Sequence, residues 1–195
     1  MESRIIIGLG NPGKKYETTR HNLGFQVVER LAKNFKIALS KNESYPGMLG
    51  QKMQDGCALS LFLPLTFVNN SGEAVAKFLK KKHLPEENIL IICDDLNLDF
   101  GQLRFKVGGS DGGHHGLQSV MAALAHDRFA RLRLGIGRPD NRDDVVNYVL
   151  THFSSEEKRK LPAFLEKAVE CCEVWLSQGA QETMNQFNNK RPLIY

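Results

Sequence analysis

The 195-residue chain is long enough to bury a sizeable core, and with 42% hydrophobic and 25% charged residues its composition is that of a soluble globular domain. No apolar run approaches the ~20 residues that a membrane span needs, and the first residues lead into a strand instead of a signal peptide, so we expect a cytoplasmic protein with no membrane partner. The net charge of +4 allows an anionic partner such as nucleic acid without requiring one, and the four cysteines, which show no metal-ligand spacing, are expected to be reduced.

The N-terminal part of the chain predicts a buried strand, a polar loop and a helix. Residues 5–7 are three isoleucines, which is typical of a buried strand. They lead into the loop 8–22, whose glycines let the backbone approach a ligand and which carries His21. From Asn22, which is well placed as an N-cap, apolar residues recur at helical spacing as far as Phe35. A loop that starts at a strand end is a common place for a functional site.

A hairpin and a second helix are expected next. Extended segments at 50–53 and 57–63 flank an Asp-Gly pair, which is a strong hairpin signal. Further along, Asn70 and Glu73 have the spacing of a capping box and predict a helix that ends near the lysines 80–82. Three lysines could bind phosphate, but cations are also favoured at a helix C-terminus by the helix dipole, and we prefer that explanation.

Strands and helices alternate in the second half of the chain. Further strands are expected at 89–93, 101–106 and 131–137, with a glycine-rich loop at 108–116 and a helix from Leu117. This alternation, together with the hairpin, predicts an α/β fold, a single domain over residues 1–195 with a twisted, mostly parallel but mixed β-sheet flanked by helices. An apolar stripe from Leu161 to Leu176 predicts a long final helix that either starts at Pro162 or is kinked there.

Three glycines in the first loop form a literal dinucleotide-binding fingerprint. Gly8, Gly10 and Gly13 have the G-x-G-x-x-G spacing directly after a strand. The fingerprint needs a helix that opens at its third glycine, yet Pro12 precedes that glycine and residues 14–20 contain no aliphatic residue. No acidic residue closes a second strand about 20 residues on. A nicotinamide or flavin enzyme is therefore a minor alternative.

The stronger candidate is a pair formed by His21 and Asp94. A histidine has a pKa that suits proton transfer near neutrality, and a carboxylate that accepts one ring N–H leaves the other nitrogen free to take a proton. Asp94 follows the predicted strand 89–93, so if both strands lie in one parallel sheet the two side chains meet at the same edge. The plainer alternative is that Asp94 turns the chain and His21 flanks a helix.

Neighbouring residues favour the catalytic interpretation. Asn11, Asn69 and Asn70 lie in predicted loops at strand ends, where an amide can donate to an oxyanion. No serine or cysteine has the setting of a nucleophile elbow, and His114 and His115 have no evident third partner for a metal. Water activated by His21 is therefore the simplest nucleophile, and we expect no metal and no cofactor.

Taken together, several motifs resemble the bacterial-type peptidyl-tRNA hydrolase family. The matching segments are Gly8-Leu9-Gly10-Asn11-Pro12-Gly13 with Tyr16, Thr19-Arg20-His21-Asn22, Pro64-Leu65-Thr66-Phe67-Val68-Asn69, Ser71-Gly72, Asp94-Asp95-Leu96, Gly112-Gly113-His114 and Arg131-Leu132-Arg133-Leu134-Gly135-Ile136-Gly137. The resemblance implies a monomeric, metal-independent enzyme that hydrolyses the ester between a peptide and the terminal ribose of tRNA. Its substrate would be peptidyl-tRNA that has dropped off ribosomes, and the reaction would recycle tRNA.

The resemblance also implies roles for particular residues. His21 would be the general base on water and Asp94 its orienting partner, while asparagines hold the peptide, the attacking water or the developing oxyanion. The implied substrate-binding residues are Asn11, Tyr16, Phe67, Asn69, His114 and His115, and those implied to contact the tRNA 5′-phosphate are Lys106 and Arg133. Phosphate contacts commonly use lysine and arginine, although a solvated surface position would also explain both residues.

Three positions depart from the family pattern. Val68 stands where methionine is usual, His115 where asparagine is usual, and Cys93 where histidine or an aromatic residue is common. None of the three replaces His21 or Asp94. Besides the dinucleotide enzyme, the remaining alternative is an RNA-binding protein without catalytic activity that uses the basic residues.

Overall fold

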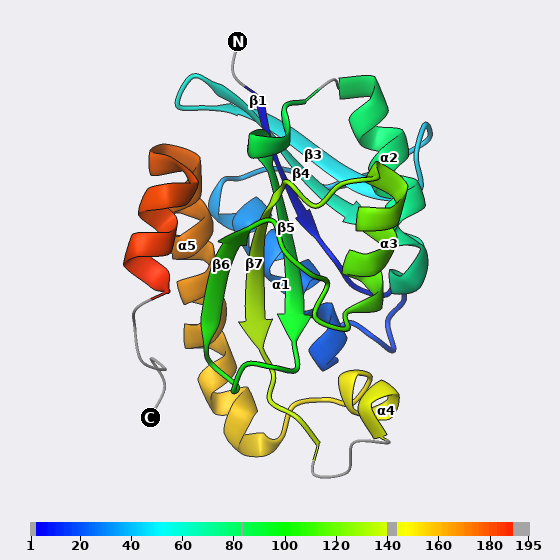
Figure 1. Ribbon diagram of the computed structural model, residues 1–195, viewed down its shortest axis with the longest axis vertical. Coiled ribbons are helices and arrows are strands. Elements are labelled where there is room, and N and C mark those ends of the chain that lie inside the picture. The colour runs from blue at the N-terminus through cyan, green and yellow to red at the C-terminus, as the bar shows by residue number, and fades with distance from the viewer. Residues whose placement is uncertain (1–2, 83, 140–143, 189–195) are drawn as a thin grey trace.

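The computed structural model describes residues 3–82, 84–139 and 144–188, and its centre is a mixed β-sheet (Figure 1). Within these residues the sheet has seven strands in the order β2-β3-β4-β1-β5-β7-β6. The strands are β1 (Ser3–Gly8), β2 (Ser40–Asn42), β3 (Gly47–Gln54), β4 (Cys57–Pro64), β5 (Ile89–Asp95), β6 (Leu103–Val107) and β7 (Ala130–Gly135). The helices are α1 (Leu23–Asn34), α2 (Ser71–Lys82), α3 (His115–Leu124), α4 (Val145–Val149) and α5 (Ser155–Phe187), with 3-10 turns at Arg20–Asn22, Val68–Asn70 and Glu86–Asn88.

The central strands are parallel, as expected from the sequence. β1 pairs in parallel with β4 and β5, and β5 pairs in parallel with β7, whereas β2, β3 and β6 add antiparallel strands at the two sides. The carboxyl ends of the parallel strands therefore meet at one edge, near which α4 lies in Figure 1. The prediction of an α/β fold with a mostly parallel, mixed sheet is confirmed.

Alternating side chains of the inner strands supply two cores, one on each face of the sheet. Ile5 and Ile7 of β1 pack in the core beside α2 and α3, whereas Ile6 packs in the core beside α1 and α5. All three isoleucines are fully buried. A parallel sheet that is covered on both faces needs strands that are apolar throughout, which explains the continuous runs in β1 and β5.

The predicted hairpin is present, and its turn explains the Asp-Gly pair. Asp55 and Gly56 connect β3 to β4 with φ angles of 47° and 80°, the two positive values that a type I′ turn requires. Glu73, predicted to belong to a capping box, instead forms an ion pair with Lys77 at 2.7 Å. The helix that follows ends at Lys82, so the lysines do lie at its C-terminus.

The last helix, α5, differs from the prediction in two ways: it starts earlier, and it is interrupted near its C-terminal end. It begins at Ser155 with a capping box between Ser154 and Glu157, seven residues before Pro162, so the expected start at the proline is wrong. At Gly179, with φ of 80°, the helical conformation is interrupted. Figure 1 shows the chain doubling back after the break, which brings the Nζ of Lys167 to 4.9 Å from the centre of the Phe187 ring. No helix in the described residues is both long and apolar enough to cross a membrane.

Candidate active site

A cavity of about 350 Å³ opens at the edge where the parallel strands end. It is bounded by the loop after β1, the end of β5, the turn before α2, the start of α3 and the short helix α4. Its lining includes all eight residues that the sequence assigned to catalysis or substrate binding, namely Asn11, Tyr16, His21, Phe67, Asn69, Asp94, His114 and His115. The topology thus brings side chains from four separate segments to one opening.

The loop that carries His21 is held closed by hydrogen bonds of Asn22. The side-chain Oδ1 of Asn22 accepts a bond from the backbone N–H of Asn11 at 2.9 Å, and its Nδ2 donates to the carbonyl of Asn11 at 3.0 Å. Asn22 does stand at the N-cap of α1, but its side chain makes no capping bond there, so that part of the prediction is wrong. The side chain instead ties both ends of the loop together and fixes the position of His21 between them.

His21 and Asp94 meet, as the sequence predicted. The Nδ1 of His21 and the Oδ1 of Asp94 are 2.8 Å apart, and both side chains are buried. Burial acts to lower the pKa of His21, but the charge and hydrogen bond of Asp94 outweigh it and raise the pKa above its usual value. Burial acts to raise the pKa of Asp94, whereas the charges and hydrogen bonds of His21 and His114 hold it well below its usual range. The carboxylate is therefore charged at neutral pH and stabilises a protonated imidazole.

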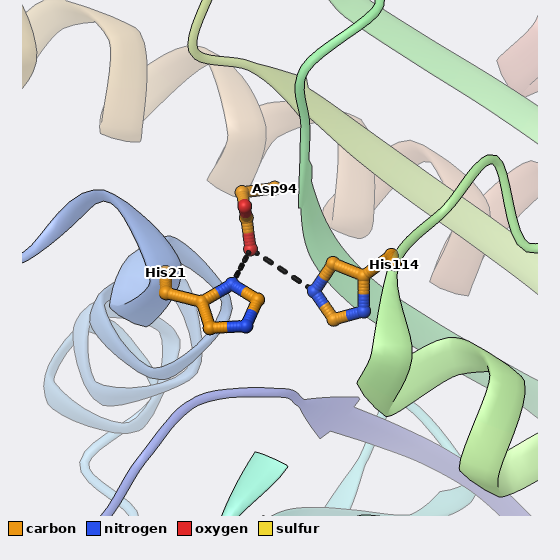
Figure 2. Close-up of side chains that lie close together, drawn as sticks. All are labelled: His21, Asp94 and His114. Carbon is orange, nitrogen blue, oxygen red and sulfur yellow. Dashed lines mark hydrogen bonds and ion pairs between the residues drawn. The ribbon is translucent and has the colours of Figure 1, made fainter. Parts of the chain in front are cut away.

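His114 is the second histidine that contacts this carboxylate (Figure 2). Its Nε2 is 3.0 Å from the same Oδ1 of Asp94, and its Nδ1 accepts the backbone N–H of Leu117 at 3.0 Å. Through that second bond the imidazole acts as the N-cap of α3. Family resemblance had suggested that His114 binds substrate, yet both ring nitrogens are engaged within the protein.

Asn11 presents an amide group to the cavity. Its Oδ1 accepts the backbone N–H of Val68 at 2.9 Å, which identifies the oxygen end of this side chain and leaves the NH₂ end for the cavity that Asn11 lines. Val68 packs against Gly116, where a Cβ atom would come within 2.6 Å of the valine methyl group. Asn69 and His115 line the cavity from exposed positions. Two amides and one exposed imidazole are thus placed where a substrate carbonyl could enter.

The apolar wall of the cavity was missed by sequence reasoning. Val145, Val146 and Val149 of α4 line it together with Leu150, and Phe67 adds an apolar side chain from the turn before α2. Phe67 is 58% exposed and Val146 is 63% exposed, so a ligand that entered the cavity would cover apolar surface on both side chains. Three valines on a helix of five residues, followed by Leu150, give too short a pattern to assign a function from sequence.

Arg20 anchors this wall to the loop of His21. Its guanidinium makes two hydrogen bonds to the carboxylate of Glu157, at 3.0 and 2.7 Å, and donates to the carbonyl of His152. It also lies over the rings of Tyr148 and Phe153, 4.5 and 5.0 Å from their centres. The segment that follows α4 is therefore bound directly to the residue that precedes His21. The motif containing Arg20 was noticed in the sequence, but its partner was not.

The two residues expected at the tRNA phosphate lie outside the cavity lining. Lys106 of β6 is exposed, and Arg133 of β7 forms an ion pair with Asp95 at 2.9 Å. The register of β6 and β7 places both side chains on the same face of the sheet. The glycine-rich loop crosses that face: a Cβ atom on Gly112 would touch the guanidinium of Arg133, and one on Gly109 would lie near the Nζ of Lys106. They are neighbours of the site and not part of its cavity.

The glycines of the fingerprint serve packing. A Cβ atom on Gly8 would lie 2.3 Å from the carbonyl oxygen of Gly24, and one on Gly10 would lie 2.8 Å from the ring of Phe25, so both allow α1 to approach the end of β1. The first α-helix begins only at Leu23, ten residues after Gly13. The loop therefore lacks the helix N-terminus that a dinucleotide pyrophosphate needs.

A metal ion fits the site poorly, although three potential ligands lie close together. Ligand atoms of His21, Asp94 and His114 are within 4.8 Å of one another. Because the Nδ1 of His114 accepts the N–H of Leu117, its proton is on the Nε2, and the lone pair that a metal would need there is not available. A bound ion would have to break the cap of α3. Cys93 adds no ligand, since it is fully buried, which raises the pKa of its thiol.

Comparisons with known proteins agree with one another. The family model for peptidyl-tRNA hydrolase matches residues 5–193. The peptidyl-tRNA hydrolase of Syntrophotalea carbinolica is 44% identical, with 98% of this chain and 100% of that protein covered, and the one from Bacillus subtilis is 42% identical, with 95% and 98% covered. The crystal structure of peptidyl-tRNA hydrolase from Acinetobacter baumannii superposes with a TM-score of 0.91 at 36% identity, covering 97% of this chain and 96% of that one.

A more distant likeness concerns the fold alone. The 5′-methylthioadenosine nucleosidase of Arabidopsis thaliana has a TM-score of 0.51 at 9% identity. The fold and the site define an α/β protein that holds a buried, hydrogen-bonded histidine–aspartate pair in a cavity at the carboxyl ends of its parallel strands. The chain belongs to the peptidyl-tRNA hydrolase family, and it is a hydrolase that acts on peptidyl-tRNA.

Proposed function

We propose that His21 is the general base of this hydrolase and that Asp94 orients it. The observation that carries the proposal is the 2.8 Å bond between the Nδ1 of His21 and the Oδ1 of Asp94 at the wall of an open cavity. With Nδ1–H donated to the carboxylate, the Nε2 of His21 has a lone pair available for a proton of water. The water oxygen then attacks the carbonyl carbon of the ester between the peptide and the terminal ribose of tRNA.

The proton and the bonds balance over two steps. As the new C–O bond forms, the proton of water moves to the Nε2 of His21 and the carbonyl oxygen becomes an oxyanion. When the intermediate collapses, the bond to the ribose oxygen breaks, and the imidazolium returns the proton to that oxygen. Free tRNA and a peptide acid result, and His21 is neutral again. General-base catalysis of this kind contributes about 10²–10⁴-fold to a rate.

Amide groups near the base would stabilise the oxyanion and hold the peptide. The NH₂ of Asn11 faces the cavity because its oxygen is held by Val68, and Asn69 adds a second amide from the turn before α2. A donor that is fixed before the reaction stabilises developing charge without further reorganisation. Tyr16 and Phe67 would contact the peptide, and His115 would take the place of an amide at the start of α3.

The basic residues beside the cavity would hold the tRNA. Lys106 and Arg133 lie on the sheet face next to the glycine-rich loop that leads to His114. A tRNA whose ester enters the cavity could therefore place one of its phosphates on these two residues. Lysine and arginine contacts to phosphate strengthen binding without contributing to the chemical step. We also propose that the enzyme acts as a monomer, as the family resemblance implies, and that it works in the cytoplasm, where translation supplies its substrate.

Release of peptide from a defined peptidyl-tRNA, with and without a chelator, tests the proposal. We expect the same rate in both samples, because the proposed steps use water and protein side chains only. A rate that falls with chelator and returns with added metal would overturn the metal-free mechanism. Tight binding of tRNA without ester cleavage would instead indicate the RNA-binding alternative, and absorbance of a bound nicotinamide or flavin in the purified protein would indicate the dinucleotide enzyme.

A further inference from the structure

One oxygen of Asp94 serves two imidazoles. Its Oδ1 accepts a hydrogen bond from the Nδ1 of His21 at 2.8 Å and another from the Nε2 of His114 at 3.0 Å. The two rings are 4.8 Å apart between centres and inclined by 48°, and they approach the oxygen from different elements, as Figure 2 shows. Two donors on one oxygen fix the rotation of the carboxylate more firmly than one donor does.

The backbone of α3 fixes which proton His114 carries. The N–H of Leu117 points at the Nδ1 of His114 over 3.0 Å, so that nitrogen is an acceptor and the ring proton is on Nε2. A second proton on Nδ1 would face the N–H of Leu117 and would break the N-cap of the helix. The ring therefore donates its Nε2–H to Asp94, and we assign the uptake of the catalytic proton to His21.

We propose that His114 is a positioning residue for hydrolysis, which holds the carboxylate of Asp94 in the orientation that His21 needs and limits how strongly that carboxylate retains a proton on His21. The proposal rests on the role of His21 as general base. A base must give its proton to the leaving ribose oxygen as well as take it from water, so a carboxylate that stabilised the imidazolium without limit would slow the return of the proton. A second donor draws on the same negative charge and moderates this effect.

The other titratable groups near His21 do not obscure the effect of His114 on the pKa of His21. Three further titratable side chains line the same cavity, Tyr16 from the loop after β1, Asp95 from β5 and His115 from α3. Asp95 is already paired with Arg133. Among the described residues, the side-chain hydrogen bond of His21 is the one to Asp94, so a change in the donors of Asp94 reaches His21 directly.

Two substitutions separate the two bonds of His114. Asparagine places an amide oxygen near the position of Nδ1, so His114→Asn keeps the cap of α3 but is too short to donate to Asp94. Glutamine places an amide nitrogen near the position of Nε2, so His114→Gln keeps the donor to Asp94 but loses the cap. His126→Gln, at a histidine beside Glu86, is the control for a remote exchange of the same type.

The test is the dependence of kcat and KM on pH for cleavage of N-acetyl-aminoacyl-tRNA. For His114→Asn we expect kcat to fall roughly 10- to 100-fold through misorientation of the base, with KM nearly unchanged. The acidic limb of the kcat profile should move to higher pH by about one unit, because Asp94 then stabilises protonated His21 more strongly. For His114→Gln the limb should stay at the parent pH, and His126→Gln should match the parent throughout.

Three outcomes would overturn the proposal. If His114→Asn raises KM and leaves kcat at the parent value, His114 binds substrate. If His114→Gln loses thermal stability and activity together while His114→Asn matches the parent, the residue is a helix cap only. If neither variant moves the acidic limb, His114 does not act through Asp94. A fully active His21→Ala variant would instead disprove the role of His21 itself, which keeps the failure of the two proposals distinguishable.

Discussion

The exchange Asp94→Asn isolates the charge of the buried carboxylate. Asparagine has nearly the same shape, and its Oδ1 can still accept the Nδ1–H of His21 and the Nε2–H of His114, which now lie 2.8 and 3.0 Å from the oxygen. The position of the rings should therefore be kept, while the negative charge beside the imidazolium is lost. Any change in the chemical step then reports the electrostatic contribution of Asp94.

The size of the effect follows from the distance. A charge pair about 4 Å apart at an effective dielectric constant near 20 is worth about 4 kcal/mol. The imidazolium forms only as the transition state is approached, so most of this energy is lost from the transition state and little from bound substrate. A loss of about 3–4 kcal/mol corresponds to a decrease in kcat of roughly 10²–10³-fold.

The pH profile of this variant gives a second test, because the direction in which its acidic limb moves can be predicted. Asp94 raises the pKa of His21, and burial alone would lower it. Without the carboxylate the pKa of His21 should fall, so the acidic limb of kcat should move to lower pH even as the plateau drops. Single-turnover cleavage of N-acetyl-aminoacyl-tRNA between pH 5 and pH 8 measures both. A kcat within about threefold of the parent, or a limb that moves to higher pH, would refute the reasoning. Asp55→Asn, in the exposed turn at the opposite edge of the sheet, is the matched control.

Three further substitutions test other parts of the account. Arg20→Ala removes the ion pair of Glu157 and should lower the free energy of unfolding, measured with urea, by about 3 kcal/mol. It should also raise KM because the α4 wall is no longer held, and unchanged values of both quantities would contradict the anchoring role. Lys106→Ala should raise KM, leave kcat unchanged and reduce the slope of log KM against log salt by about 1, whereas an unchanged slope would place Lys106 away from phosphate. Gly8→Ala should destabilise the fold by at least about 2 kcal/mol, since its Cβ would lie 2.3 Å from the carbonyl of Gly24, and parent stability would contradict the packing role.

Much of the fold was predictable because the signals are local. Three consecutive isoleucines in β1 and the apolar run that opens β5 mark strands that are buried on both faces, and alternation with helices then leaves few topologies. From that topology alone, His21 and Asp94 had to lie at the same edge. The Asp-Gly turn needed no tertiary information, since two adjacent positive φ angles restrict the residues that fit.

Side-chain partners were less predictable, because a polar side chain bonds with whatever the fold brings near it. Asn22 has the residue type and the position of an N-cap, but the backbone of Asn11 lies close enough to take its side chain instead. His114 has the appearance of a ligand residue in a glycine loop, yet its partners are Asp94 and the backbone of α3. The reversal at Gly179 depends on packing against the first half of α5, which no local pattern reveals.

The most direct test of the central claim is hydrolysis of a defined peptidyl-tRNA by His21→Ala, measured together with binding of tRNA by the same variant. We expect binding within a few-fold of the parent and a loss of kcat of about 10²–10⁴-fold, because the base is removed while the cavity and the basic residues remain. Hydrolysis at the parent rate would contradict the claim that this imidazole activates the attacking water.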